Sequence, residues 1–549
     1  MSRKVKINKQ LVKLATLLFL ISIANNTFAQ NYLWAKRAGG NSTDKGQSVT
    51  TDNSGNIITT GFFDSPIIAF GNTNLVNPST GYHEAYLVKY NGDGNLLWAK
   101  KIGGIESEIG ASVCVDSSGN IILVGSFESA SITIGITTLP NSGIDDIFVA
   151  KFYPNGDLIW AKGYGGPSMD NPTCVTTDST GNIIFCGNYT SPSLNFGNIT
   201  LTNQGSYDLF MTKLNPNGNV LWAKNFGGTN FEIDAYVKCN TNGEIFLSGS
   251  FASDSISIGN STLNNTGLCD IFLAKFDNNG EAIWSINEGG TDYDFSSQIS
   301  LDTNGNVYLI GDYSSASMTV GPNTLINSGF YDIVISKFNS NGTAIWAKSY
   351  GGSSSEDANS IICEDNGSVF ASFSFSSTAI SSGNFYFNNV GNSDILLMKL
   401  DSLGNSVWAQ SIGGIDSEEC TSMTLDVNKN LIFTGGFRSQ PLVLGSINLN
   451  NAGGDDVLLT KIAAASITEI DDQELSLVEL YPNPANDVLN VLTAADALGK
   501  NYFILDVTGK AIFSGQILDK NASIPVENLA NGYYTIIIDS QYTGRFLKQ

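Results

Sequence analysis

The chain has 549 residues, of which 42% are hydrophobic and only 14% are charged, and its formal net charge is −23. This composition is too apolar for an intrinsically disordered protein, and the excess of acidic groups argues against nucleic acid and anionic lipids as partners. The 57 glycines, with frequent Asn, Ser and Thr, are typical of many short strands joined by tight turns.

Residues 1–30 have the pattern of a secretory signal peptide. Basic residues up to Lys13 precede a short apolar run at 14–24, and a small residue, Ala29, stands near the end of the segment. A charged start, a short apolar centre and a small residue before the cut are the three parts of such a signal. The apolar run is too short to span a bilayer and no later segment is long enough, so we expect no transmembrane segment in the mature chain.

A fixed repeat organises most of the chain. The seven tryptophans lie 64 residues apart once and 62 residues apart afterwards: Trp34, Trp98, Trp160, Trp222, Trp284, Trp346 and Trp408. A Gly-Gly pair follows each Trp by five residues, and an aromatic residue, a Ser and a single Gly recur later in every unit. A constant period of this length is the signature of a repeat architecture.

Each unit has the pattern of four short strands, which in the second unit are 111–115, 120–127, 147–152 and 157–162. Turns rich in Gly, Asn and Asp join the first pair and the second pair. The joint between the second and third strands is long and differs most among the copies, and helical periodicity is nowhere sustained. Four strands per unit predict the blades of an all-β protein, a β-propeller.

The two ends of the repeat predict a closed ring. In six units a Lys stands nine residues before the next Trp, whereas Lys461 has no Trp after it and Trp34 has no Lys before it. If residues 31–40 supply the fourth strand of the last blade, these two become the seventh pair. We therefore expect a seven-bladed propeller closed by N- and C-terminal strands in one blade, because an open stack would leave two bare sheet edges.

The units resemble the SBBP-type β-propeller repeat. The matching residues in one copy are Asp146, Lys151, Asn155-Gly156, Trp160-Ala161, Gly165-Gly166 and 178–182. The resemblance covers residues 31–463, with local departures at Phe373 and at Ser285-Ile286. It implies the fold and a secreted setting, and it implies no particular activity.

After the repeat, residues 464–477 are expected to be a linker and residues 478–549 a small β-sandwich of alternating strands. The last segment resembles the type A C-terminal sorting domain of the type IX secretion system of Bacteroidetes. The matching residues are Tyr481, Pro482, Asn483, Pro484, Gly509, Gly532 and Lys548. The resemblance implies export through the periplasm to the cell surface or medium, the type IX machinery as a partner, and removal of the domain. The alternative is an adhesive sandwich with a coincidental motif.

Two acidic positions recur in every unit. One set is Asp44, Glu108, Asp170, Glu232, Asp294, Glu356 and Glu418; the other is Glu84, Asp146, Asp208, Asp270, Asp332, Asp394 and Asp456. Carboxylates with nearby carbonyl oxygens can hold calcium, so the first set is a possible metal site, with calcium as the possible cofactor. A role needed in every blade is more often structural, and that interpretation is the favoured one.

No catalytic constellation stands out. His83 is the single histidine, and nucleophile-elbow, zinc-protease and phosphate-loop motifs are missing from the sequence. The favoured hypothesis is a secreted or cell-surface module for binding or adhesion to a glycan or protein. The alternatives are a carbohydrate-active enzyme that uses two carboxylates, and a structural surface protein stabilised by calcium. The odd count of seven cysteines leaves at least one unpaired, and Cys174 and Cys186 flank one expected hairpin.

Overall fold

The computed structural model describes residues 32–383, 385–464, 476–492, 497–505, 511–538 and 542–548. The predicted signal peptide and most of the predicted linker lie outside these ranges. The chain divides into two compact units, Met1–Ile467 and Thr468–Gln549. In the described ranges no helix is long and apolar enough to cross a membrane.

The described part of the first unit contains seven antiparallel four-stranded sheets. Each is named here from its inner to its outer strand. The first three are β2 (Asp44–Thr51), β3 (Ile57–Phe63), β6 (Glu84–Tyr90) and β7 (Leu96–Ile102); β8 (Glu108–Val115), β9 (Ile121–Phe127), β12 (Asp146–Phe152) and β13 (Leu158–Tyr164); β14 (Asp170–Thr177), β15 (Ile183–Tyr189), β18 (Asp208–Leu214) and β19 (Val220–Phe226).

The next three are β20 (Glu232–Cys239), β21 (Ile245–Phe251), β24 (Asp270–Phe276) and β25 (Ala282–Glu288); β26 (Asp294–Leu301), β27 (Val307–Tyr313), β30 (Asp332–Phe338) and β31 (Ala344–Tyr350); β32 (Glu356–Cys363), β33 (Val369–Phe375), β36 (Asp394–Leu400) and β37 (Ser406–Ile412). The last is β38 (Glu418–Leu425), β39 (Leu431–Phe437), β42 (Asp456–Ile462) and β1 (Tyr32–Ala38).

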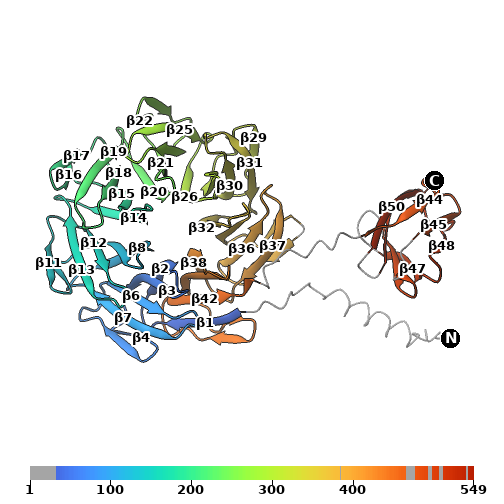
Figure 1. Ribbon diagram of the computed structural model, residues 1–549, viewed down its shortest axis with the longest axis horizontal. Coiled ribbons are helices and arrows are strands. Elements are labelled where there is room, and N and C mark those ends of the chain that lie inside the picture. The colour runs from blue at the N-terminus through green and yellow to red at the C-terminus, as the bar shows by residue number, and fades with distance from the viewer. Residues whose placement is uncertain are drawn as a thin grey trace, which may run out of the picture. The chain divides into compact units, whose positions relative to one another are not determined.

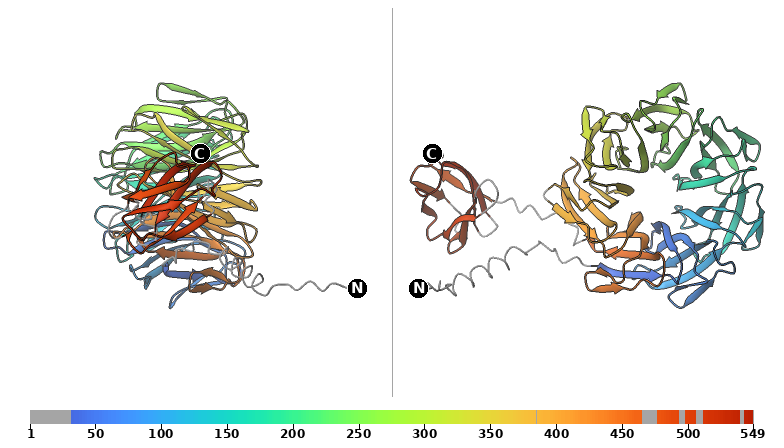
Figure 2. Two further views of the ribbon diagram at one scale, coloured as in Figure 1. Left: turned by 90° about the vertical axis from the view of Figure 1, so that its right-hand side faces the viewer. Right: turned by 180° about the vertical axis from the view of Figure 1, so that it is seen from behind.

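The sheets are arranged around a ring, with the first strand of each sheet nearest the centre (Figures 1 and 2). The second and third strands are the most buried, since nearly every residue of β6, β12 and β18 is inaccessible to solvent. Their apolar side chains pack between neighbouring sheets, as Phe185 and Phe210 do against Ile122 and Val124. Repeated four-stranded sheets ranged around a common centre define a β-propeller.

The last sheet contains strands from both ends of the repeat. Strand β1 pairs antiparallel with β42, and Trp34 lies opposite Lys461 in the register. The same Lys–Trp opposition occurs within the other sheets, for example between Lys89 and Trp98. The leftover Trp and Lys of the repeat therefore face each other across one strand pair.

Trp and Lys side chains also join each sheet to the next. The Trp98 indole donates a hydrogen bond of 3.3 Å to the carbonyl of Pro154, in the following sheet. The Lys89 ammonium lies 2.9 Å from the Asp52 carboxylate of its own sheet and 3.1 Å from the same Pro154 carbonyl. Trp34 makes the equivalent bond of 3.2 Å to Gly92, so β1 belongs to this network.

The long joint between the second and third strands, which was expected only to vary among the copies, folds into a separate two-stranded hairpin in every unit. These are β4 (Ile67–Phe70) with β5 (Thr73–Val76), β10 (Ser131–Ile134) with β11 (Thr137–Pro140), β16 (Ser193–Phe196) with β17 (Ile199–Thr202), β22 (Ser255–Ile258) with β23 (Ser261–Asn264), β28 (Ser317–Val320) with β29 (Asn323–Ile326), β34 (Ala379–Ser382) with β35 (Phe385–Asn388), and β40 (Leu442–Leu444) with β41 (Ile447–Leu449). The recurring Gly stands at each tip with a positive φ, 57° at Gly71, which suits a two-residue turn.

The second unit contains two sheets in its described residues. One has the order β43 (Ser476–Leu477), β50 (Tyr542–Lys548), β49 (Gly532–Ile538), β46 (Asn501–Leu505) and β47 (Ala511–Gln516). The other has the order β44 (Glu479–Tyr481), β45 (Val488–Leu492) and β48 (Asn521–Pro525). Buried residues of both sheets, such as Leu489, Ile524 and Ile536, share one hydrophobic cluster.

Candidate functional site

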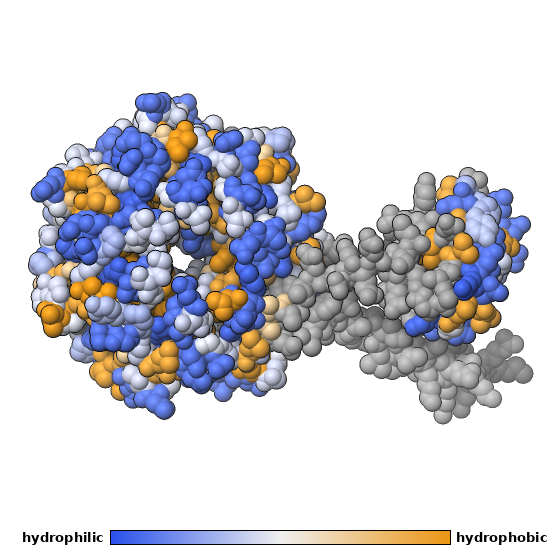
Figure 3. Space-filling model, in the orientation of Figure 1, coloured by the Kyte–Doolittle hydropathy of each residue, from blue (hydrophilic) through white to orange (hydrophobic). Residues whose placement is uncertain are grey.

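A cavity of about 460 Å³ lies where the first strands of the sheets face one another. Figure 3 shows the ring hollowed at its centre. Hydroxyl and amide side chains from several sheets dominate the wall: Gln47, Ser48, Ser112, Thr173, Ser297, Gln298, Asn359, Thr421 and Ser422. The cavity is therefore rich in neutral groups that donate and accept hydrogen bonds.

The repeat is broken on one side of this cavity, in β20, β26 and β27. Tyr236 and Gln298 occupy the inner position at which other sheets carry small residues such as Ser48 and Ser112. Asp234 replaces the Gly or other small residue found two positions after the recurring acid. Because a scaffold needs the same residue in every blade, residues that depart from the repeat mark a place with another role.

Asp234 stands in an unusual backbone conformation. Its φ is +61°, a region that a non-glycine residue adopts at a cost, and the pairing of β20 with β21 shifts register between Ile233 and Tyr236. Burial raises the pKa of Asp234 to about 6, although its side chain is hydrogen-bonded to Ser250. The bulge thus presents a carboxyl group to the cavity at a position where the other inner strands carry none.

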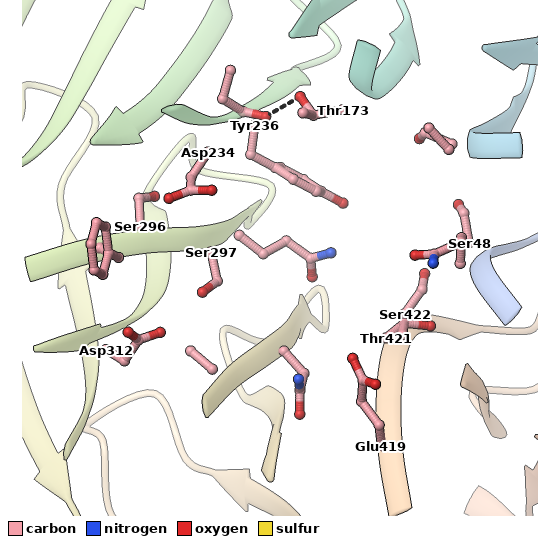
Figure 4. Close-up of a pocket in the computed structure, with 18 residues that line it drawn as sticks. Ser48, Thr173, Asp234, Tyr236, Ser296, Ser297, Asp312, Glu419, Thr421 and Ser422 are labelled. Atoms are coloured by element: carbon pink, nitrogen blue, oxygen red, sulfur yellow. Dashed lines mark hydrogen bonds between the residues drawn. The ribbon is translucent and has the colours of Figure 1, made fainter. Parts of the chain in front are cut away.

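Asp312 on β27 provides a second carboxyl group. Burial raises its pKa well above the usual value, and the charges of Asp357 and Asp234 act in the same direction. The pKa of Asp357 is raised in turn by burial and by Glu419. Figure 4 shows Asp234 and Asp312 on one side of the cavity and Glu419 on the other. Acidic groups of neighbouring sheets thus raise one another's pKa around the cavity.

Three aromatic rings lie in a row beside Asp312. Phe295 is its direct partner across β26 and β27, and it lines the cavity. The ring of Tyr293 stacks on Phe295 with centroids 5.8 Å apart and planes 16° apart, and Tyr331 lies 6.3 Å away on a plane tilted by 26°. All three side chains are only partly buried. Such a row offers flat apolar surface next to carboxylates.

The recurring acids predicted as a possible metal site lie elsewhere, at the start of each inner strand. They are Asp44, Glu108, Asp170, Glu232, Asp294, Glu356 and Glu418, and all are buried. Asp44 accepts hydrogen bonds from the backbone of Gly40, at 2.8 Å, and from the backbone and hydroxyl of Ser65. Equivalent bonds recur in other sheets, for instance from Gly166 and Ser191 to Asp170. Each of these acids thus fixes the loop that leads into its inner strand from the preceding outer strand.

The second set of acids explains the Gly-Gly pair. A Cβ atom on Gly103 would overlap the carboxylate of Glu84, and one on Gly165 would overlap Asp146. Each of these carboxylates has a buried oxygen without a hydrogen-bond partner among the described residues. In the described part of the chain, no group of three or more His, Cys, Asp or Glu side chains is arranged to hold a metal. Calcium at the first set of acids, from Asp44 to Glu418, stays a prediction.

His83 has specific partners where β3 ends and β6 begins in the first sheet. Its ring is hydrogen-bonded to Asp64 and packs on Phe62 with centroids 4.4 Å apart. The bond to Asp64 raises the pKa of His83. Cys174 and Cys186 lie opposite each other in β14 and β15, buried and with free thiols.

The residues expected to carry the sorting signal belong to the second unit. The Tyr481 hydroxyl donates to Asn521 at 2.7 Å, and the side-chain oxygen of Asn483 accepts from the backbone N–H of Leu547 at 2.9 Å. Lys548 ends β50 opposite Gly532, and it is buried. Pro482 and Pro484 lie in the segment between β44 and β45, whereas Gly509 lies outside the described residues.

Residues 479–548 match the family of secretion system C-terminal sorting domains. This tail indicates export to the cell surface or secretion, with involvement of the type IX secretion machinery. The predicted sorting domain is thereby confirmed.

Two curated proteins are similar to this chain. An uncharacterized WD repeat-containing protein of Acanthamoeba polyphaga mimivirus is 25% identical over 503 residues, which span 75% of this chain and 36% of that protein. The regulatory protein FlaEY of Caulobacter vibrioides is 26% identical over 180 residues, spanning 32% of this chain and 18% of that protein. The chain thus spans about a third or less of the length of these relatives.

Solved structures of similar arrangement include the Pan2 WD40 domain of Neurospora crassa, at 11% identity and a TM-score of 0.39, covering 77% of this chain and 91% of that chain. A polysaccharide lyase described as a PL25 ulvan lyase has 10% identity and a TM-score of 0.40, covering 76% of this chain and 96% of that chain.

Sequence reasoning missed Asp234, Tyr236, Phe295 and Asp312. A signal was present for Asp234 and Tyr236, because both replace small residues when the seven copies are aligned by their Trp residues. Phe295 and Asp312 stand in columns that vary among the copies, so the alignment did not mark them. What the alignment lacked was the bulge at Asp234 and the pairing of Phe295 with Asp312, which bring these residues to one cavity.

Proposed function

We propose that the chain is an exported binding module, a seven-bladed β-propeller closed by β1, whose ligand occupies the central cavity. One observation carries this proposal. The repeat is regular at the acids and glycines that join the sheets, but at the cavity Asp234, Tyr236 and Gln298 replace small residues of the other copies. Phe295 and Asp312 lie beside them in the same wall. A regular scaffold with a local, polar and aromatic departure is the usual form of a ligand site.

A glycan array and a cell-surface pull-down with the full chain test the proposal. The wild type should retain a ligand, and Phe295→Ala should weaken retention about tenfold, the usual scale for loss of a stacking residue. Tyr386→Ala is the matched control, because Tyr386 is exposed on β35 and lies away from the cavity wall. Equal retention by wild type and both variants would place the ligand elsewhere, and no ligand in either assay would count against a binding module.

A carbohydrate-active enzyme is the second proposal, and the carboxyl groups of Asp234 and Asp312 favour it. Two carboxyl groups of different acidity are what glycoside cleavage by acid–base catalysis needs, and burial holds the pKa of Asp234 at about 6. New reducing ends from polysaccharides incubated with the wild type, lost in Asp312→Asn, would support it. Absence of cleavage across neutral and charged polysaccharides would eliminate it and leave the binding module.

We further propose that the tail is a type A sorting domain, folded as a small sandwich and removed after export. The shared hydrophobic cluster of its two sheets supports a separate fold. Deletion of residues 478–549 should retain the propeller in the periplasm, as cell fractionation would show. Unchanged surface display of the shortened chain would contradict this role.

A further inference from the structure

The charged residues that line the cavity are all acidic. Asp234, Asp312 and Glu419 line it, and no Lys, Arg or His stands among the lining residues that the structure describes. Lys45 approaches from β2, but its ammonium group is paired with Glu419 at 2.6 Å. On the opposite side Asp234 and Asp312 have no basic partner among the described ion pairs, and burial raises the pKa of both. A cationic ligand would therefore supply the partner that favours their ionised forms.

A hydroxyl group without a hydrogen-bond partner lies in the same cavity wall as Asp234 and Asp312. Ser296 is 1% exposed and lines the cavity, and its hydroxyl has no hydrogen-bond partner among the described residues. Its backbone N–H donates at 2.9 Å to the hydroxyl of Ser250, the residue that also holds Asp234. A buried polar group without a partner costs free energy, so a ligand that supplies one gains affinity. Figure 4 shows Ser296 on the same side of the cavity as Asp234.

The spacing and chemistry of the lining residues favour an organic cation over a metal ion. The acidic groups are too dispersed to form a cluster of three that would hold a metal ion in the described residues, yet they act on one another's pKa. An organic ammonium ion fits wider spacing, and the aromatic row at Phe295 adds attraction for a cation. Apart from alanines and two aromatic residues, the other lining groups are hydroxyls and amides, which suit a hydroxylated ligand better than aliphatic peptide side chains.

We propose, building on the binding function above, that the cavity takes oligosaccharides of amino sugars with free ammonium groups. A sugar ring lies against Phe295, the member of the aromatic row that lines the cavity. Its hydroxyls reach the Ser, Thr and Asn side chains, and its ammonium group lies between Asp234 and Asp312. Anionic sugars are disfavoured by the same carboxylates.

Calorimetry with the full chain tests the ammonium group directly. A glucosamine hexamer should bind at least tenfold more tightly than the N-acetylated hexamer of equal length, because acetylation removes the charge and leaves the ring. Binding of the glucosamine hexamer should weaken as salt rises, since charge attraction contributes to it. A hexalysine peptide carries the same charge without sugar rings and should bind at least tenfold more weakly.

Variants locate the site. Asp312→Asn and Phe295→Ala should each weaken binding of the glucosamine hexamer about tenfold, and Asp93→Asn, which alters an exposed acid in a turn, should leave it unchanged. Thermal melting checks that each variant is folded. Tighter binding of hexalysine, or equal affinity for the two hexamers, would overturn the amino-sugar assignment. If neutral glycans were still retained through Phe295 in the array, the binding module would stand without it; loss of both would end both proposals.

Discussion

At the scale of single residues, the recurring acids serve the scaffold at an electrostatic cost. Each inner-strand acid is buried and receives N–H and hydroxyl donors, but burial outweighs these bonds and raises the pKa, to about 7 for Glu108 and about 6 for Asp170 and Asp294. An acid of the preceding sheet adds to the effect, as Glu84 does for Glu108. The interfaces between sheets therefore favour the protonated form of these groups.

This predicts a pH dependence of stability that Glu108→Gln should reduce. The folded pKa of Glu108 lies above its unfolded value, so its stabilising contribution is present below about pH 4.5 and is lost as the pH rises through about 7. Between pH 4.5 and 8 the free energy of unfolding of the wild type should fall by about 3 kcal/mol relative to that of the variant. Urea unfolding at both pH values measures the difference.

The matched control for this test is Asp157→Asn, which changes an exposed acid in a turn and should run parallel to the wild type. Parallel profiles for the wild type and Glu108→Gln would contradict the assignment of a burial cost. A rise in melting temperature on adding calcium, abolished by Glu108→Gln, would instead support the predicted calcium role of this acid.

The Gly-Gly pair provides a second test at this scale. A Cβ on Gly103 would overlap a buried carboxylate, whereas the nearest side-chain atom to a Cβ on Gly163, in the outer strand β13, lies 3.6 Å away. Gly103→Ala should therefore lower the free energy of unfolding by about 2 kcal/mol or more, while Gly163→Ala should change it little. Chemical denaturation of the two variants measures this. Equal losses would mean that the carboxylate moves aside without cost.

At the scale of strands and hairpins, most of the architecture could be predicted because the repeat poses one packing problem seven times. Trp, Gly-Gly and the Gly-Asn turns recur at fixed spacing, and each has a local physical reason that the sequence displays. The small outer hairpins were hidden, since their Gly tips recur while their strand residues vary. The cavity residues were hidden for the opposite reason: they occur once, and only the pairing of β26 with β27 places Phe295 against Asp312.

At the scale of the whole molecule, the ring brings residues far apart in the chain into contact. Arg37 of β1 forms an ion pair with the buried Asp456 of β42, and the Trp34 indole reaches Gly92 in the neighbouring sheet. The Thr460 hydroxyl donates to the Trp34 carbonyl at 3.0 Å. Strand β1 thus ties the last sheet to the first through its backbone and through side chains on both sides.

Deletion of residues 32–38 should consequently destabilise the propeller far more than deletion of residues 468–475, which lie after the last sheet. The first change exposes the hydrogen-bonding edge of β42 and leaves Asp456 buried without its cationic partner, which is costly in itself. We expect the melting temperature of the β1 deletion to fall by about 10 °C or more, with aggregation through the open edge, and that of the linker deletion to change by no more than about 2 °C. Differential scanning calorimetry and light scattering measure both effects.

A synthetic peptide of residues 31–40 added in trans should restore part of the loss, because it can pair with the same edge. Equal melting temperatures for the two deletions would mean that β1 adds no stability to the ring, and the seven-bladed closure would have to be abandoned.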